Sequence, residues 1–130
     1  MRREFSLAED DEICLKDTGL VWETIVENKT KWLILRQLPI QSGYNVAAAD
    51  AALRIPPSYP DDQIDMVYFS PGLALTSGKT IRQLSSTTID GKPYQQWSRH
   101  RTAENPWRAG LDNVGTHLLQ VNDWLHRELK

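Results

Sequence analysis

LVWETIVENKTKWLILRQL, residues 20–38, is the stretch that decides the fold class. Two runs rich in β-branched, aromatic and aliphatic residues flank the polar tetrapeptide ENKT at residues 27–30. Two such runs joined by a short polar turn are typical of a β-hairpin. We therefore predict that an antiparallel sheet begins here.

Two further strands are expected after this hairpin. Pro39 and Gly43 end the pattern, and the alanine-rich run that follows is compatible with either a helix or a strand. Because its charged residues fit a helical stripe poorly, we predict a third strand from about Ala49 to Ile55. DMVYFS, residues 65–70, is the predicted fourth strand, after a connection stiffened by prolines.

A helix is predicted on each side of these strands. In SLAEDDEICLKDTG, residues 6–19, Ser6 is a candidate N-cap, the first turn is acidic, and Gly19 is suited to end the helix. Near the end of the chain, apolar residues recur at steps of three and four, and Asp112 is expected at the amino end of that helix. The residues of this stripe are Leu111, Val114, Leu118, Val121, Leu125 and Leu129.

These elements predict one α+β domain over residues 1–130. Its order is an N-terminal helix, a four-stranded antiparallel meander, a long loop from Pro71 to Pro106, and a C-terminal helix. Glycine, serine, threonine and proline dominate that loop, and loops of this length in compact domains are usually functional. We therefore expect the active site there.

Composition narrows the classes of function. The 130 residues carry 17 acids and 15 lysines and arginines, so the net charge of −2 provides no general attraction for nucleic acid or an anionic membrane. Cys14 is the single cysteine, which excludes an internal disulfide and a thiolate-rich metal site. The acidic amino terminus does not have the pattern of a signal peptide, and no apolar run is long enough to span a bilayer. We expect a cytoplasmic protein.

Several motifs carry a resemblance to a known family. Tyr59-Pro60 stands before the strand-like MVYF at residues 66–69, and Pro106-Trp107 stands before the last helix, with the long loop between them. This arrangement resembles the ubiquitin-conjugating enzyme fold. More narrowly, GYNV, IPPSYPD, FSP, IDGKPYQQWSRHR and the terminal helix resemble the prokaryotic ubiquitin-conjugating-like family E, over residues 10–130.

The resemblance places the catalytic residue in the loop, and there the sequence departs from the familiar pattern. Ubiquitin-conjugating enzymes have a cysteine in this loop after a His-Pro-Asn tripeptide, and this loop has neither. Ser98 lies nine positions before Trp107, close to where that cysteine would fall. The residues that would hold the tripeptide read LSSTTID, residues 84–90.

The residues around Ser98 suggest how a serine would replace the cysteine. A serine hydroxyl needs an adjacent base to act as a nucleophile. His100 lies two residues further along an extended segment, so its side chain is expected to point to the same side as Ser98 and to act as that base. Arg99 and Arg101 are expected to bind the incoming tail or to stabilise the oxyanion, and their charges would disfavour protonation of His100.

Other serine and histidine residues are candidates for a nucleophile or a metal ligand. Ser85 and Ser86 are alternative nucleophiles, although no histidine lies near them in the sequence. His117 and His126 fall on the last helix too far apart to share a metal ion, so no metal site is expected.

The resemblance implies a conjugating enzyme that accepts the C-terminal acyl group of a ubiquitin-like protein and transfers it to an amine. It also implies partners: a ubiquitin-like protein, an ATP-dependent activating enzyme and a deconjugating metalloprotease. No cofactor is expected.

Two alternative functions remain open. One is a catalytically inactive module of the same fold that only binds a ubiquitin-like protein. The other is a single-stranded nucleic-acid-binding domain. It would stack bases on Trp97 and Trp107 and bind phosphates with the basic cluster of Arg99, Arg101 and Arg108.

Overall fold

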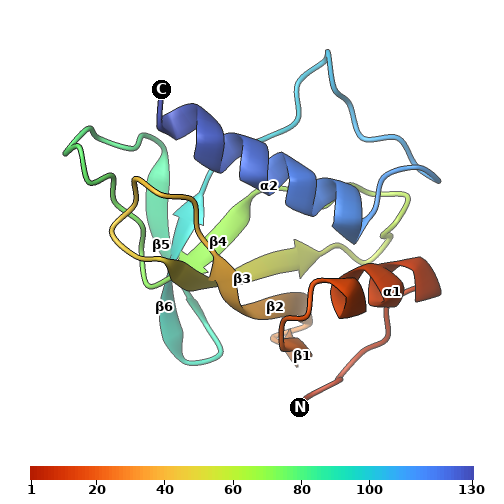
Figure 1. Cartoon of the computed structure of the whole chain (residues 1–130). Helices are drawn as coiled ribbons and strands as arrows, with labels where there is room; N and C mark the ends of the chain where they lie inside the picture. The colour runs from red at the N-terminus through yellow and green to blue at the C-terminus, as the bar shows by residue number, and fades with distance from the viewer.

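In a computed structural model that describes residues 1–130, the chain forms a six-stranded antiparallel sheet with two helices over one face (Figure 1). The strand order in the sheet is β1-β2-β3-β4-β6-β5. The predicted α+β class, with a helix before and after the sheet, is confirmed. The elements are α1 (Glu9–Asp17), β1 (Trp22–Glu27), β2 (Thr30–Pro39), β3 (Ala48–Ile55), β4 (Val67–Ser70), β5 (Leu84–Ile89), β6 (Lys92–Trp97) and α2 (Val114–Glu128).

The hairpin predicted from residues 20–38 is formed by β1 and β2. Glu27 pairs with Thr30, so Asn28 and Lys29 alone make the turn. Their φ angles of 51° and 66° place both in the left-handed region, as a type I′ turn requires. The following strands β3 and β4 also form where the sequence predicted them, each within two residues of the expected bounds.

The prediction of a single long loop from Pro71 to Pro106 is wrong, because this stretch contains β5 and β6. Asp90 and Gly91, with φ angles of 54° and 74°, form a second two-residue turn between them. An Asp-Gly pair is a strong hairpin signal, but the serine- and threonine-rich LSSTTI lacks the apolar alternation that usually identifies a strand. The sheet therefore has six strands, and two shorter loops remain, at residues 71–83 and 98–113.

The N-cap of the C-terminal helix lies one residue after the predicted Asp112. Asn113, not Asp112, is the N-cap of α2, and it forms a reciprocal capping box with Thr116. The ends of the predicted stripe lie outside the core, since Leu111 is 65% exposed and Leu129 is 37% exposed. The middle of the stripe packs against the sheet as predicted.

The N-terminal helix starts at Glu9, so the prediction of Ser6 as its cap is also wrong. Ala8 occupies the N-cap position and makes no side-chain hydrogen bond there. Gly19, with a φ of 72°, follows the end of the helix as predicted. Neither α1 nor α2 combines the length and the apolar character that a helix needs to cross a bilayer.

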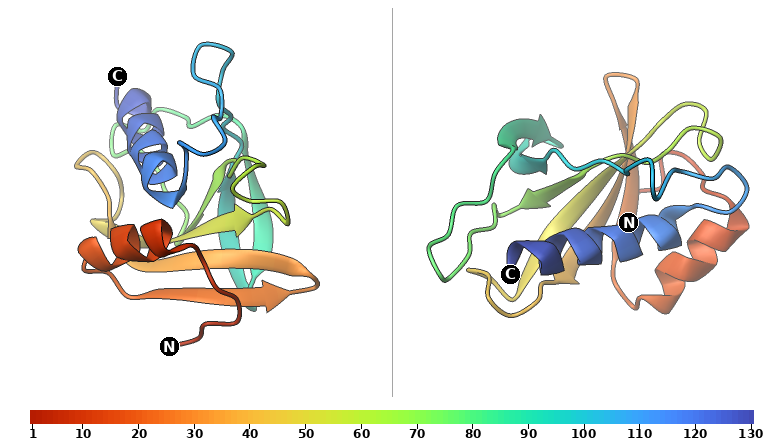
Figure 2. Two further views of the ribbon diagram at one scale, coloured as in Figure 1. Left: turned by 90° about the vertical axis from the view of Figure 1, so that its right-hand side faces the viewer. Right: turned by 90° about the horizontal axis from the view of Figure 1, so that it is seen from above.

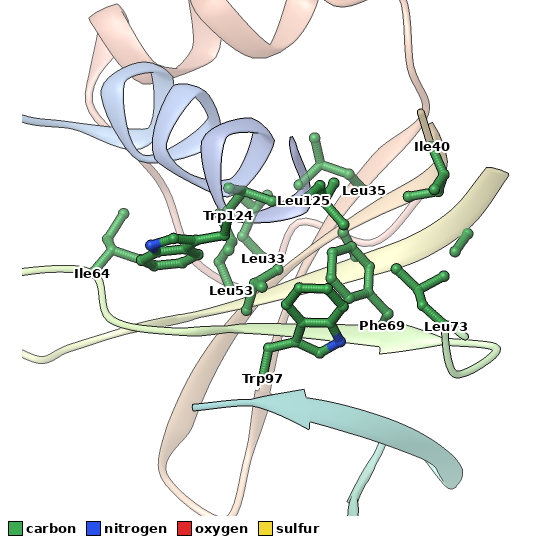
Figure 3. Packing of buried hydrophobic residues seen from close by; sticks show 14 of the residues in the cluster. Leu33, Leu35, Ile40, Leu53, Ile64, Phe69, Leu73, Trp97, Trp124 and Leu125 are labelled. Atoms are coloured by element: carbon green, nitrogen blue, oxygen red, sulfur yellow. The ribbon is translucent and has the colours of Figure 1, made fainter. Parts of the chain in front are cut away.

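The main core lies between the sheet and the two helices (Figure 3). Trp97, at the end of β6, is fully buried in it and meets the ring of Phe69 edge-on at 5.4 Å. Because Trp97 is fixed in the core, the residues directly after it leave the sheet from a fixed point. The core residues labelled in the figure are Leu33, Leu35, Ile40, Leu53, Ile64, Phe69, Leu73, Trp97, Trp124 and Leu125.

The opposite face of the sheet buries a second, smaller cluster without any helix over it. Its members are Ile25, Trp32, Ile34, Ala52, Tyr68, Ile89 and Tyr94. The sheet covers this cluster by curling, and Figure 2 shows the β5–β6 hairpin crossing the direction of β1 and β2. The backbone N–H of Asp90 donates to Glu27 at 3.0 Å, and Arg2 binds the carboxylates of Glu23 and Asp90. These contacts join the two ends of the sheet.

A buried carboxylate ties the two helices together. Asp11 of α1 is 1% exposed and accepts hydrogen bonds from the Tyr59 hydroxyl at 2.8 Å and the Val114 N–H at 3.1 Å. Val114 is the first residue of α2, where free N–H groups favour a negative charge. Burial and the Asp11 carboxylate raise the pKa of Tyr59, which therefore stays a hydrogen-bond donor.

Candidate functional site

The Tyr-Pro and Pro-Trp motifs contact one another. The indole N–H of Trp107 donates to the carbonyl oxygen of Pro60 at 2.9 Å. The rings of Tyr59 and Trp107 lie 6.2 Å apart between their centroids. Segments 47 residues apart in the sequence are joined here. The contact anchors the loop of residues 98–113 at Trp107.

Ser98 stands at a tight bend directly after β6. Its N–H donates to the carbonyl of Gln83 at 3.0 Å, which extends the pairing of β5 and β6 by one residue. The N–H of Arg99 donates to the carbonyl of Trp97 at 2.9 Å, so Ser98 is the central residue of a three-residue turn. The Ser98 hydroxyl is half-buried and lies 3.5 Å from the amide nitrogen of Gln96.

The two arginines predicted at the site point toward α2. Arg99 forms an ion pair with Glu128 at 2.9 Å and lies over the ring of Trp97. The side chain of Arg101 is only 5% exposed and lies between the Trp107 ring and the Asp112 carboxylate, 3.5 Å from the latter. The segment therefore contacts residues at both ends of α2.

The carboxylate of Asp112 is ionised in this setting. Burial would raise its pKa, but the hydrogen bond from the Arg108 backbone and the charges of Arg101 and Arg108 together lower the pKa below its usual range. The buried guanidinium of Arg101 thus has a charged partner, as a buried ion requires.

His100 lies on the opposite side of the segment from these arginines. Its side chain is 61% exposed, and its Nδ1 lies 2.9 Å from both carboxylate oxygens of Asp65. This contact leaves Nε2 free to accept a proton. Ser98 and His100 alternate with Arg99 and Arg101 along the chain, but the structure shows no hydrogen bond between the Ser98 hydroxyl and the imidazole. The Ser98 hydroxyl is instead placed against Gln96.

Asp65 is the residue of this site that the sequence reasoning missed. It lies two residues before β4, and β4 pairs with β6 so that Val67 stands opposite Trp97. This register brings the residues before β4 beside those after β6. The contact between Asp65 and His100 is therefore predictable only from the pairing of β6 with β4, and the sequence pattern predicts a loop where β6 lies.

Two residues with left-handed backbone conformation flank Ser98. Met66 has a φ of 61° and Gln83 a φ of 59°. The other non-glycine residues with positive φ lie in the two hairpin turns or at the irregularity within β2. Long side chains disfavour this conformation, and residues held in it cluster at functional sites. Gln83 accepts the hydrogen bond from Ser98, so the strain lies beside the candidate nucleophile.

The conformation of Met66 is supported from beneath by α2. The Nε2 of the fully buried His117 lies 2.8 Å from the Met66 carbonyl oxygen. Burial lowers the pKa of His117 to about 4, so the ring is neutral near neutral pH. A neutral ring that donates from Nε2 to a carbonyl holds the turn between Asp65 and β4 in place.

Other candidate groups are separated from this arrangement. Cys14 lies on α1, and burial together with Asp11 and Asp17 raises the pKa of its thiol, which disfavours the reactive thiolate. Ser85 and Ser86 are exposed on β5, and neither hydroxyl is hydrogen-bonded to a histidine. No group of three or more His, Cys, Asp or Glu side chains is placed to hold a metal ion.

Comparison with known protein families gives one match over nearly the whole chain. The family model described as prokaryotic E2 family E matches residues 7–128. The match includes every element of the fold and all the residues gathered around Ser98. No curated protein and no solved structure gives a significant match to the chain.

Proposed function

The chain belongs to the prokaryotic E2 family E, and from that premise we propose that it conjugates a ubiquitin-like protein through an ester on Ser98. An E2-like chain has the conjugating role, in which an acyl group is held and then passed on. The observation that supports Ser98 is the hydrogen-bonded pair of Asp65 and His100, with His100 two residues after Ser98 in the chain. This pair supplies a base and a group that orients the base, as activation of a serine requires.

In the first step, Ser98 accepts the acyl group. The hydroxyl oxygen attacks the activated C-terminal carbonyl carbon of the ubiquitin-like protein, and the hydroxyl proton moves to Nε2 of His100. The leaving group departs with the bonding electron pair and takes that proton. Asp65 stabilises the imidazolium that forms between these events and, by binding Nδ1, leaves Nε2 as the ring nitrogen that takes the proton. This step requires a hydrogen bond between the Ser98 hydroxyl and Nε2 of His100. Catalytic hydrogen bonds are often long in the free enzyme and tighten once substrate is bound.

In the second step, an amine replaces the serine. The amine nitrogen attacks the ester carbon, the bond between that carbon and the Ser98 oxygen breaks, and the oxygen keeps the electron pair. His100 takes the proton from the amine and returns it to the serine oxygen. The product is an amide, and Ser98 is free again.

The amide nitrogen of Gln96, 3.5 Å from the Ser98 hydroxyl, is a donor for the charge that develops on the carbonyl oxygen. The amide oxygen of Gln96 accepts a hydrogen bond from the Thr87 hydroxyl at 3.0 Å, which turns the amide nitrogen toward Ser98. An amide donor held in this way can act as part of an oxyanion hole. Arg99 and Arg101 already bind carboxylates near α2, so a role for them in binding the tail would require these ion pairs to open.

The proposal implies partners that an E2-like role requires in general. An activating enzyme that uses ATP would supply the acyl group, and a ubiquitin-like protein with a free C-terminus would carry it. A deconjugating metalloprotease would reverse the modification. The acceptor is any amine that reaches the outer side of Ser98.

A second candidate is a module that binds the ubiquitin-like protein without forming a covalent bond. One observation favours it, because the Ser98 hydroxyl contacts Gln96 and not His100. In that case the exposed His100 and Asp65 would contribute only to a binding surface.

The decisive experiment asks whether an ester forms on Ser98. The protein is incubated with the activating enzyme, ATP and the ubiquitin-like protein of its pathway, and the product is treated with hydroxylamine or with a thiol reductant. We expect an adduct that hydroxylamine cleaves and the reductant does not, and peptide mass spectrometry should locate it on Ser98. No covalent product with these partners would refute the enzyme and favour the binding module.

A further inference from the structure

The two edges of the sheet differ in how they are covered. Residues 2–5 run along β1 on its outer side. The N–H of Thr24 donates to the Arg2 carbonyl at 3.1 Å, and the Thr24 carbonyl accepts from the Glu4 N–H at 2.9 Å. The Glu4 carboxylate also accepts the N–H of Val26 at 2.8 Å. An edge whose backbone groups are bonded in this way is closed to another strand.

The β5 edge has no such cover. β5 pairs with β6 on one side, and no backbone hydrogen bond is formed on the other. Its sequence, LSSTTI, contains none of the lysines, charged residues or prolines that usually protect an edge strand. Ser85, Ser86 and Thr88 are exposed. A bare, neutral edge is a template for an extended peptide, which gains affinity through main-chain hydrogen bonds.

The register with β6 shows which backbone groups of β5 are free. Gln83 accepts the N–H of Ser98, and hydrogen bonding alternates along an antiparallel pair. Residues with odd numbers from 83 to 89 therefore direct their backbone groups toward β6. Leu84, Ser86 and Thr88 direct their N–H and C=O groups to the outer side.

The direction of β5 determines which end of a bound peptide would reach Ser98. β5 begins beside Ser98, at the Gln83 contact of 3.0 Å, and runs away from it toward Ile89. A strand added antiparallel to β5 would run toward Ser98 and end there with its C-terminus. A parallel strand would present its N-terminus instead. Only the antiparallel arrangement brings a C-terminal carboxyl to the nucleophile.

The remaining gap and the local charge also suit a C-terminal tail. An added strand would lie two strand spacings from β6, or about 10 Å, which about three extended residues can cross. Arg82 lies next to Gln83 at this end of β5, is exposed, and forms no ion pair in the structure. Its guanidinium would donate hydrogen bonds to the carbonyl oxygens of an approaching tail.

We propose that the C-terminal tail of the ubiquitin-like protein binds as an antiparallel strand along the free edge of β5. The tail would pair with Leu84, Ser86 and Thr88 through its backbone, and its last residues would cross Gln83 to reach Ser98. This inference rests on the proposed function of Ser98, because that function requires a C-terminal carboxyl to arrive there.

A proline substitution tests the edge through adduct formation. Ser86→Pro removes an outward N–H without removing a bond to β6, a position that an edge strand tolerates. With the activating enzyme, ATP and the ubiquitin-like protein, we expect adduct formation at subsaturating ubiquitin-like protein to slow roughly tenfold or more. Ser85→Ala is the control for the loss of a serine hydroxyl on β5, since it leaves every backbone N–H in place, and it should stay within about twofold of the wild-type rate. Thermal unfolding of each variant establishes that it is folded.

Hydrogen exchange in the unmodified chain tests the same edge without any substitution and without any chemistry. The probe is a synthetic peptide of the last eight residues of that ubiquitin-like protein, with a free carboxylate. We expect the amides of Leu84, Ser86 and Thr88 to gain protection, while those along β1 do not change.

The outcomes distinguish the proposed binding of the tail along β5 from the proposed ester on Ser98. Protection of these amides without any adduct would support the edge and refute the ester on Ser98. The opposite result is a normal adduct on Ser98, no added protection of the β5 amides, and a wild-type rate for Ser86→Pro. It would refute tail binding along β5 and would leave the proposed function unchanged. If Ser86→Pro does not fold, the exchange measurement alone decides.

Discussion

The two sides of the segment from Ser98 to Arg101 use similar residues for different purposes. On the inner side, Arg99 and Arg101 bind carboxylates and hold α2. On the outer side, the exposed His100 binds Asp65 and keeps one ring nitrogen free. The difference shows that a charged side chain next to a candidate nucleophile in the sequence need not take part in catalysis. Alternation along an extended chain assigns every second residue to the core side.

The largest effect is expected at Ser98, on the outer side. Ser98→Ala should abolish the ester adduct, because no other group at the site can form it. The free energy of unfolding should change by less than about 0.5 kcal/mol, since a half-buried hydroxyl with one long contact contributes little. Ser98→Cys should restore an adduct that is now cleaved by a thiol reductant. A hydroxylamine-sensitive adduct on Ser98→Ala would place the nucleophile elsewhere, with Ser85 and Ser86 as the next candidates.

His100→Ala should slow adduct formation by roughly 10²–10⁴-fold, the usual contribution of a positioned base. The deficit should shrink as pH rises, because hydroxide then takes over the deprotonation. Stopped-flow or quenched measurements across pH would show this convergence. The melting temperature should not change, since the ring is 61% exposed. A loss of rate that is independent of pH would mean that His100 binds the substrate and does not act as a base.

On the inner side, Arg101→Ala should lower the free energy of unfolding by about 3 kcal/mol, because it removes a buried guanidinium and leaves Asp112 with only the exposed Arg108 as a charged partner. Urea denaturation measures the change. Arg127→Ala is a matched control, since that arginine also pairs with an aspartate but is 63% exposed, and it should cost less than about 1 kcal/mol. If Arg101→Ala were as stable as the control yet lost adduct formation, the inner arginine would have a direct role in the chemistry.

His117, beneath the site, should make stability depend on pH. Burial lowers its folded pKa to about 4 from an ordinary value of 6.5, so the unfolded chain binds the proton more readily. Its stabilisation is complete above pH 6.5 and is lost as pH falls through 4, by about 3 kcal/mol in total. Urea denaturation at several pH values should show a steeper loss of stability in the wild type than in His117→Gln, because carboxylates with lowered pKa values contribute a slope in both. The exposed His126→Gln should keep the wild-type slope, and an unchanged slope in His117→Gln would contradict the assignment.

The sequence allowed the fold class to be predicted better than the site. The hairpin at residues 20–38 and the middle of α2 were predictable because their apolar residues follow the periods of a strand and a helix. β5 was not predictable because Ser85, Ser86, Thr87 and Thr88 separate its two apolar residues, so the strand lacks the usual apolar alternation. The inward direction of Arg101 depends on Asp112, and the contact of His100 depends on the pairing of β4 with β6. Such contacts between distant segments are not encoded in local spacing.

The smallest effect is expected for Asp65. Its substitution tests whether Asp65 acts on the reaction through His100. An ion pair exposed to water is worth up to about 1 kcal/mol, so Asp65→Asn should slow adduct formation by roughly fivefold. A double-mutant cycle decides whether this loss passes through His100, because Asp65→Asn should have no further effect in the His100→Ala background. Asp62→Asn is a matched control on the same segment, as Asp62 is exposed and pairs with no basic group. If Asp65→Asn slows the reaction equally with and without His100, then Asp65 acts on the substrate directly, and the pairing seen in the structure is not what orients the base.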